Sequence, residues 1–246
     1  MDNDDHAVAA VLAEAAGQRL LALRSRTPPE RLGAAGDRAS QDLLLRRLAA
    51  LRPADAVLSE QAVDDPRRLA AERVWIIDPL DGTREYAEGR SDWAVHVALW
   101  ERGELRAGAV AVPGRWLLLT TAKPPPGPPA RSIDGPLRFL VSRTRPPEIA
   151  GKVAGAIGAE LVPMGSAGAK TAAVVLGEAD AYIHAGGQYE WDSAAPAAVA
   201  LAAGLHASRI DGSPLRYNQP DTRLPDILVC RRGLEGMLLA EIARGL

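Results

Sequence analysis

The chain has 246 residues, with 29 Lys or Arg against 31 Asp or Glu, a net charge of −2 and 47% hydrophobic residues. That length and composition suit one domain, or two packed lobes, with a sizeable core. The charge balance excludes binding to a nucleic-acid polymer through a basic surface. The only cysteine, Cys230, excludes intramolecular disulfides. Because the N-terminus is acidic and no apolar run reaches membrane-spanning length, we expect a cytoplasmic protein without a membrane partner.

The first half of the chain combines helical and strand patterns. Apolar periodicity predicts helices over 8–23 and about 40–51. Apolar runs predict strands at 56–59, 74–77, 93–100, 105–112 and 116–120, with a hairpin turn at 101–104.

A proline-rich stretch at 123–129 cannot pack as a helix or a central strand. We therefore place a loop at 122–136, between a first lobe (1–121) and a second lobe (137–246). In the second lobe, strands expected at 137–142, 160–163, 179–184, 206–210 and 226–229 alternate with helices expected at 146–157, 166–176, 193–203 and 233–244. This alternation is an α/β pattern.

Residues 74–86 carry most of the chemical information. A strand-like run, Val74–Ile77, ends in Asp78, and Pro79 forbids simple continuation of the sheet. Asp81 follows on the same tight turn, so two carboxylates leave one strand end together. Such oxygen ligands suit Mg²⁺, which keeps open positions for a substrate phosphate. The alternative is an ordinary Asp-Pro-Gly turn after a buried strand.

Three further carboxylates stand at element boundaries. Glu60 follows the strand at 56–59, Asp192 stands where an alanine-rich helix begins, and Asp37 precedes the helix at 40–51. Asp192 and Asp37 could each be a plain helix cap. It is their occurrence together with Asp78 and Asp81 that favours a metal site.

The order and spacing of these motifs resemble the lithium-sensitive, Mg²⁺-dependent phosphomonoesterases of the inositol monophosphatase superfamily. The resemblance runs along nearly the whole chain and rests on Asp37, Ser59-Glu60, Asp78-Pro79-Leu80-Asp81-Gly82-Thr83, Gly165-Ser166 and Trp191-Asp192. The following Arg84-Glu85-Tyr86 is most similar to the CysQ-type branch, which acts on 3′-phosphoadenosine 5′-phosphate. Two positions depart from the family: Gln61 replaces a second acid, and Pro196 replaces a glycine in what we expect to be the first turn of a helix.

The resemblance implies a layered αβαβα sandwich, with an α+β first lobe and an α/β second lobe, and a homodimer. It implies one Mg²⁺ on Glu60, Asp78 and the Leu80 carbonyl, and a second on Asp78, Asp81 and Asp192. Gln61 puts a third, weakly held ion in doubt. Thr83 and Asp37 would orient the attacking water, and Li⁺ would inhibit.

Candidate substrate contacts are weaker signals. The resemblance places Gly82, Thr83, Gly165 and Ser166 near the substrate. Ser166 could instead be only a helix cap. Arg84 and Lys170 could bind a phosphate, although an arginine paired with Glu85 and a solvated lysine are the ordinary alternatives.

The sequence does not decide the roles of several aromatic side chains. Tyr189, Trp191 and Tyr217 could stack on an adenine or simply pack. His96 and His184 lie in strand-like runs and are expected to be structural.

The sequence therefore predicts a small-molecule phosphatase that removes the 3′-phosphate of adenosine 3′,5′-bisphosphate in support of sulfate assimilation. A broader phosphatase of inositol-1-phosphate or fructose-1,6-bisphosphate is the alternative. A non-catalytic homologue that binds Mg²⁺ and a nucleotide is a third possibility.

Overall fold

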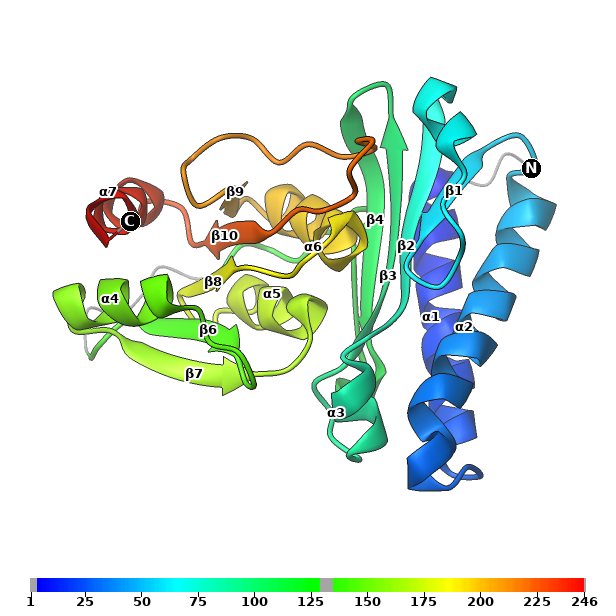
Figure 1. The fold of residues 1–246 in the computed structure, drawn as a ribbon, viewed down its shortest axis with the longest axis horizontal. Helices are drawn as coiled ribbons and strands as arrows, with labels where there is room; N and C mark the ends of the chain where they lie inside the picture. Colours follow the sequence, from blue (N-terminus) through cyan, green and yellow to red (C-terminus); the bar gives the residue numbers. More distant parts are fainter. Residues whose placement is uncertain (1–3, 129–134, 246) are drawn as a thin grey trace.

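A computed structural model describes residues 4–128 and 135–245. Two five-stranded sheets and three helical layers form an αβαβα sandwich, as Figure 1 shows from the α1/α2 layer on the right to α7 and α4 on the left. The expected layered fold is confirmed. No helix in the described ranges is long and apolar enough to cross a membrane.

The first sheet has the order β1-β2-β3-β4-β5. Its strands are β1 (Ala56–Ser59), β2 (Arg73–Asp81), β3 (Ala94–Glu101), β4 (Glu104–Val112) and β5 (Leu117–Thr120). β1 runs parallel to β2, and the other neighbours are antiparallel. Both faces of β2 are buried, which explains why its sequence is a continuous apolar run rather than an alternating one.

The two faces of the first sheet meet different helices. Trp75 and Ile77 pack on α1 (Asp5–Arg24) and α2 (Pro29–Leu51), whereas Val74 and Ile76 pack toward the middle helices. This two-residue period follows from the alternation of side chains along a strand. The expected start of the second helix near residue 40 is wrong, because α2 begins at Pro29. Asp37 therefore lies inside a helix and does not cap one.

The middle layer consists of α5 (Ala167–Val175) and α6 (Glu190–Ala202), which are rich in alanine and buried between the two sheets. Small side chains let the layers approach closely: a Cβ on Gly108 of β4 would lie 2.7 Å from the Cβ of Ala198. Because α6 begins at Glu190, Pro196 falls in the helix interior and not in its first turn as expected.

The second sheet has the order β7-β6-β8-β10-β9 and mixes parallel with antiparallel pairs. Its strands are β6 (Arg138–Ser142), β7 (Glu160–Met164), β8 (Ala181–Ala185), β9 (His206–Ser208) and β10 (Asp226–Cys230). Helices α4 (Glu148–Ile157) and α7 (Glu235–Gly245) cover its outer face, where Cys230 is buried in the third apolar cluster.

Short elements complete the fold: α3 (Thr83–Ala87) and the 3₁₀ turns η1 (Pro66–Ala70) and η2 (Pro113–Arg115). The first sheet uses only residues 56–120 and the second only 138–230. The lobe limits 1–121 and 137–246 stay a prediction. Part of the proposed loop at 122–136 lies outside the described residues, since 129–134 are not among them.

Candidate active site and metal centre

The C-terminal end of β2 presents two buried carboxylates. The expectation that the strand ends at Asp78 was wrong: β2 continues to Asp81, with an irregular register between these two residues. Pro79 lies in this irregular part, where its missing N–H removes no regular ladder bond. Asp78 Oδ1 accepts a hydrogen bond from the Leu80 N–H at 3.0 Å, which shapes the turn.

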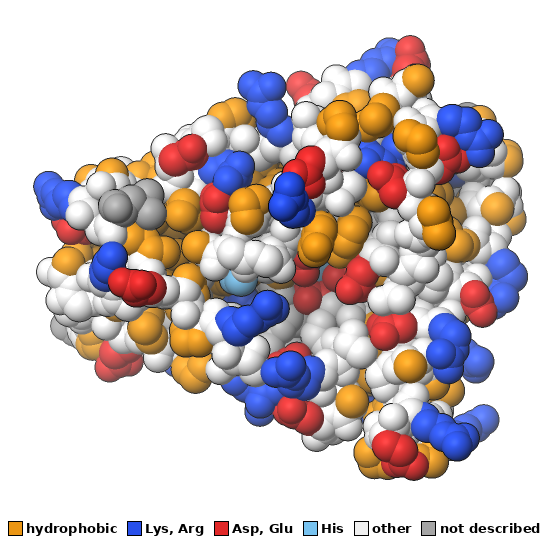
Figure 2. Space-filling view, viewed as in Figure 1, with side chains coloured by type: hydrophobic (Ala, Val, Ile, Leu, Met, Phe, Trp, Pro, Cys, Tyr) orange, Lys and Arg blue, Asp and Glu red, His pale blue; other side chains and the backbone are white. Residues whose placement is uncertain are grey.

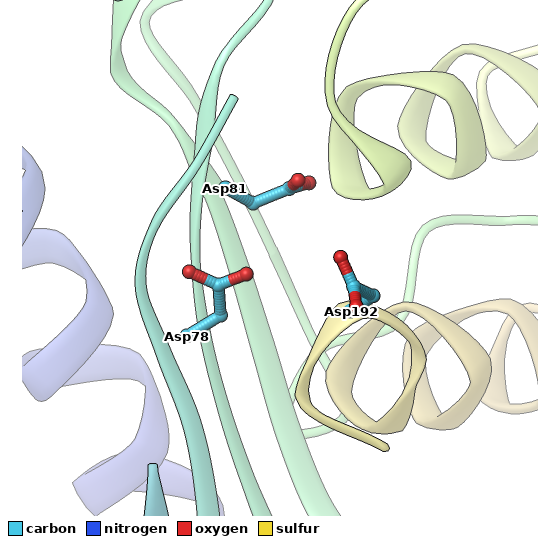
Figure 3. A group of neighbouring side chains, drawn as sticks. All are labelled: Asp78, Asp81 and Asp192. Carbon is cyan, nitrogen blue, oxygen red and sulfur yellow. The ribbon is translucent and has the colours of Figure 1, made fainter. Parts of the chain in front are cut away.

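Asp192 on α6 reaches the same space. One carboxylate oxygen each from Asp78, Asp81 and Asp192 lies within 4.8 Å of the others, and Figure 3 shows the three side chains converging from β2 and α6. Burial, followed by neighbouring carboxylates, raises the pKa of Asp78 well above its usual range and that of Asp192 to about 7. Such a concentration of like charges fits a hard cation, which would stabilise all three ionised carboxylates.

Glu60 lies at the rim of this cluster, directly after β1. Its pKa is raised by burial, then by the negative charges of Asp37 and Asp81. Glu60 is not one of the three converging carboxylates. Because the charge of Asp81 acts on Glu60, Glu60 lies near the carboxylate cluster.

Asp81 differs from its neighbours because one of its oxygens is surrounded by donors. Oδ2 accepts hydrogen bonds from the Ser166 hydroxyl and from the Gly168 N–H at 2.9 Å, and His96 Nε2 lies 3.2 Å away. Burial alone would raise the pKa of Asp81, but His96, Lys170 and Ser166 lower it to about 2. Asp81 is therefore held ionised, with Oδ1 left for a cation.

Thr83 and Asp37 are adjacent at the opening of the turn. The Thr83 hydroxyl lies 3.0 Å from the Leu80 carbonyl oxygen and 3.3 Å from Asp37 Oδ1. Gly82, at φ +84°, makes the left-handed step that leads into α3. Burial raises the pKa of Asp37 to about 6. A hydroxyl and a carboxylate of this kind can hold a water molecule and accept its proton.

A buried network ties the two halves of this site together. Arg68, on the chain between Glu60 and β2, donates to Asn218 Oδ1 at 2.7 Å, and the Asn218 N–H donates to Glu190 at 2.6 Å. Glu190 starts α6, two residues before Asp192, whose own carboxylate accepts the Tyr189 N–H at 2.8 Å. Asp192 is thus both a capping residue and a member of the carboxylate cluster.

A pocket of about 240 Å³ opens beside the carboxylates. Figure 2 shows acidic and basic side chains gathered around a hollow near the centre of the molecule. The residues that line the pocket are Asp81, Gly82, Thr83, Arg84, Glu85, Ser142, Arg143, Thr144, Arg145, Met164, Gly165, Ser166, Ala167, Lys170, His184, Gly187, Gln188 and Asp192.

Four of these side chains are basic. Lys170 is buried, donates to the Ser166 carbonyl at 2.7 Å and lies over the Tyr182 ring, and burial lowers its pKa to about 8. Arg143 is bound by Glu85 at 2.9 Å. The guanidinium groups of Arg84 and Arg145 make no hydrogen bond or ion pair to any residue that the structure describes. These two remain available to an anionic ligand.

The structure brings together Asp78, Asp81 and Asp192 and places Gly82, Thr83, Arg84, Gly165, Ser166 and Lys170 in the lining of the adjoining pocket. Asp37 contacts Thr83, and Glu60 lies outside the converging group. The ordinary alternatives for Lys170 and Arg84 are not observed, since Lys170 is buried and Glu85 pairs with Arg143. Ser166 does cap α5, accepting the Ala169 N–H at 3.0 Å. Of the aromatic candidates, Tyr217 is buried and Tyr189 stacks on Trp191.

Other site residues were not anticipated. His96 and His184 lie in strands, as expected, but each reaches the site, and Arg143 and Arg145 follow β6. The sequence signal was present for the arginines, because Arg143-Thr144-Arg145 directly follows the predicted strand at 137–142. The alternation of side chains along a strand does not show which of the two faces will contact the site, so the positions of His96 and His184 could not be predicted.

Comparison with protein families gives one match. The model of the inositol monophosphatase family matches residues 4–125 and 132–244.

Curated relatives are similar over most of their length. The 3′-phosphoadenosine 5′-phosphate phosphatase of Mycobacterium bovis is 54% identical over 238 residues, covering 93% of this chain and 89% of the relative. The protein of the same name from Mycobacterium leprae is 53% identical, covering 97% and 93%. The 3′(2′),5′-bisphosphate nucleotidase CysQ of Escherichia coli K12 is 29% identical, covering 77% and 81%.

Solved structures share the fold. Inositol monophosphatase II from Staphylococcus aureus has a TM-score of 0.79 at 22% identity, covering 94% of this chain and 90% of that one. An inositol monophosphatase from Zymomonas mobilis has a TM-score of 0.81 at 21% identity, covering 98% of both chains.

Proposed function

Because the chain belongs to the inositol monophosphatase family of metal-dependent phosphoric monoester hydrolases, we propose that it removes the 3′-phosphate of adenosine 3′,5′-bisphosphate. The products are adenosine 5′-monophosphate and phosphate, and clearing this by-product supports sulfate assimilation. The observation that carries the proposal is the 54% identity to a 3′-phosphoadenosine 5′-phosphate phosphatase over 93% of the chain.

The pocket supports a substrate with two phosphates. Converging carboxylates suit a cation that neutralises the phosphate to be cleaved, while Arg84 and Arg145 line the same pocket and are unpaired among the described residues. A guanidinium binds a second phosphate through two parallel hydrogen bonds. Gly82, Thr83, Gly165, Ser166 and the buried Lys170 line the same pocket.

The proposed metal ligands are the same residues that the sequence resemblance implies. Glu60, Asp78 and the Leu80 carbonyl would hold one Mg²⁺, and Asp78, Asp81 and Asp192 a second. Bound there, Mg²⁺ would lower the pKa of a water molecule and neutralise the charge that develops on the leaving oxygen. Because its donors lower the pKa of Asp81 to about 2, Asp81 would offer an ionised oxygen to the cation.

Thr83 and Asp37 complete the chemistry. The Thr83 hydroxyl, close to the Asp37 carboxylate, orients the attacking water, and Asp37 takes up the proton that the water loses. The Arg68–Asn218–Glu190 network keeps α6 in register with the chain that follows Glu60. No covalent intermediate is needed, because the proposed nucleophile is water. The one free cysteine of the described residues, Cys230, is buried and does not line the pocket.

Four further properties form part of the proposal. Mg²⁺ is the working ion, because all proposed ligands are oxygens. Inhibition by Li⁺ and a homodimer rest on the family resemblance. A cytoplasmic location agrees with the single buried thiol.

The test is to identify the product. Incubation of adenosine 3′,5′-bisphosphate with the protein and Mg²⁺, followed by chromatography, should give adenosine 5′-monophosphate. Adenosine 3′-monophosphate as the product would reverse the proposed orientation of the substrate. No phosphate release with Mg²⁺ would reject the function.

A further inference from the structure

The turn that leads into α5 contacts α3 and β3 at close range. Gly165 precedes the helix, and Gly168 is its second residue. A Cβ on Gly165 would overlap the Glu85 side chain, and a Cβ on Gly168 would overlap the His96 ring. The two glycines therefore let the turn between them, which contains Ser166, approach the residues around the carboxylate cluster.

Ser166 has a backbone conformation that residues with a side chain rarely adopt. Its φ is +51° and its ψ is 131°, which lies outside the small left-handed region open to such residues. A strained residue of this kind persists only where surrounding contacts hold it, and such residues cluster at functional sites. The contacts that hold Ser166 therefore bear on the function of the site.

Hydrogen bonds hold the strained turn on both sides of Ser166. The Gly165 N–H donates to Asp92 Oδ2 at 2.7 Å. The ammonium group of the buried Lys170 donates to the Ser166 carbonyl oxygen at 2.7 Å and lies 3.4 Å from the Met164 carbonyl oxygen. These bonds tie the turn to the residue before β3 and to α5, so the direction of the Ser166 side chain is fixed.

The proton of the Ser166 hydroxyl is already used within the protein. A hydroxyl donates one hydrogen bond, and that of Ser166 goes to Asp81 Oδ2, because an ionised carboxylate can only accept. The same hydroxyl accepts the Ala169 N–H at 3.0 Å. Ser166 is 6% exposed, and its hydroxyl has no second proton to donate to a substrate phosphate.

The Asp81 carboxylate is oriented by donors from the start of α5. Oδ2 accepts the Ser166 hydroxyl, and it accepts the Gly168 N–H at 2.9 Å. Figure 3 shows the Asp81 side chain pointing from β2 toward α5. Because Oδ2 is held by two donors, Oδ1 is the oxygen left for a cation. Hydrogen bonds of this kind orient a metal ligand and are needed for full metal affinity.

We propose that Ser166 is a positioning residue for the metal centre, whose hydroxyl orients the Asp81 carboxylate for the cation and does not bind the substrate. The strained turn brings this hydroxyl from the start of α5 to a carboxylate on β2. The inference rests on the proposed function, in which Asp81 holds Mg²⁺, and it assigns a different role to a residue that the sequence resemblance placed near the substrate.

Two variants separate the hydroxyl from the backbone strain. Ser166→Ala and Ser166→Gly both lack the hydroxyl, but only glycine adopts a positive φ without strain. Calorimetric titration with Mg²⁺, without substrate, should show an affinity about 10- to 100-fold below that of the wild type in both variants. In the metal-free state, Ser166→Gly should melt about 2–4 °C above Ser166→Ala. Mg²⁺ affinity should thus follow the hydroxyl, and the melting temperature should follow the backbone.

Ser208→Ala is the matched control, because Ser208 is a buried residue of β9 that does not line the pocket. Its Mg²⁺ affinity should equal that of the wild type. In steady-state kinetics, saturating Mg²⁺ should return the KM of Ser166→Gly for adenosine 3′,5′-bisphosphate close to the wild-type value, since the substrate has lost no contact. Should Ser166→Ala fail to fold, the Mg²⁺ affinity and the KM of Ser166→Gly decide the matter.

Wild-type Mg²⁺ affinity in both variants would overturn the inference. Affinity lost in Ser166→Ala but kept in Ser166→Gly would also overturn it, because the strain and not the hydroxyl would then be responsible. A KM of Ser166→Gly that stays raised at saturating Mg²⁺ would instead assign the hydroxyl to substrate binding. Failure of the proposed function is distinct from these outcomes, since the wild type itself would then release no phosphate from the nucleotide with Mg²⁺.

Discussion

His96 Nε2 lies 3.2 Å from Asp81 Oδ2, and the other ring nitrogen of His96 lies 3.1 Å from the Trp191 carbonyl oxygen. The contact with Asp81 is within ion-pair distance, but His96 Nε2 has no partner with hydrogen-bond geometry among the described residues. Burial alone would lower the pKa of His96, but Asp81 and the carbonyl raise it. His96 thus contacts both β2 and α6 from β3, beside the carboxylate cluster.

The first prediction concerns this histidine as a positioning residue. His96→Leu should weaken Mg²⁺ binding by about 10- to 100-fold, the range found when a group that orients a metal ligand is removed. Calorimetric titration of the protein with Mg²⁺ measures this without turnover. His96→Asn, which retains a donor, should lose less. Equal Mg²⁺ affinity in His96→Leu and the wild type would show that the contact has no role in the centre.

Asp78→Asn should reduce turnover by at least about 1000-fold, because it removes the carboxylate proposed to serve both ions. The same change should raise the melting temperature of the metal-free protein, since Asp78 is 2% exposed and repelled by Glu60, Asp81 and Asp192. Higher stability with lost activity separates a catalytic effect from unfolding. Activity like that of the wild type would overturn the site assignment.

Thr83→Ala should lower kcat about 10- to 100-fold while leaving KM nearly unchanged, because the hydroxyl is proposed to orient water rather than to bind substrate. Thr83→Ser restores the hydroxyl and should recover most of the rate. Steady-state kinetics on all three proteins decides the matter. A large rise in KM at constant kcat would instead assign Thr83 to substrate binding.

The stability of the metal-free protein should depend on pH. The pKa of Asp192 is raised from 3.8 to about 7, so the folded protein holds a proton that the unfolded chain has released between these values. The contribution to stability is complete below pH 3.8 and is lost as the pH rises through about 7.

Mg²⁺ requires the ionised carboxylate, so it should stabilise the protein more at about pH 8 than at about pH 5. Melting temperatures with Mg²⁺ and with a chelator at both pH values test this. Equal stabilisation by Mg²⁺ at the two pH values would contradict the proposed ligand set.

Much of the first lobe was predictable because its signals are local. The run at 74–77 and its two aspartates formed a strand and a turn as expected, apart from the continuation past Pro79. The start of α2 was missed because residues 29–39 include Gly33 and Gly36, which disfavour a helix. Packing explains Gly36: a Cβ there would lie 2.8 Å from the Tyr86 ring and 2.9 Å from Leu80. Contacts with distant residues thus override local propensity.

The part of the pocket wall that His184 and Gln188 form could not be predicted in this way. These two residues join Asp81 and Asp192 in the pocket lining only because the fold brings the end of β8 and the turn before α6 there, which no local pattern encodes. The grouping of Asp78, Asp81 and Asp192 was within reach, because each of them stands next to an apolar run whose structure is predictable. The expectation that Asp37 precedes its helix was wrong.

The most direct test of the central claim is phosphate release with Mg²⁺, comparing kcat/KM for adenosine 3′,5′-bisphosphate, inositol-1-phosphate and fructose-1,6-bisphosphate, with and without Li⁺. The account predicts a preference of about 100-fold or more for the nucleotide, because inositol-1-phosphate has only one phosphate and fructose-1,6-bisphosphate holds its two phosphates at a different spacing. It also predicts that Li⁺ suppresses the release. Equal rates on all three substrates would contradict the account. If none of them released phosphate with Mg²⁺, the protein would be a binding protein and not an enzyme.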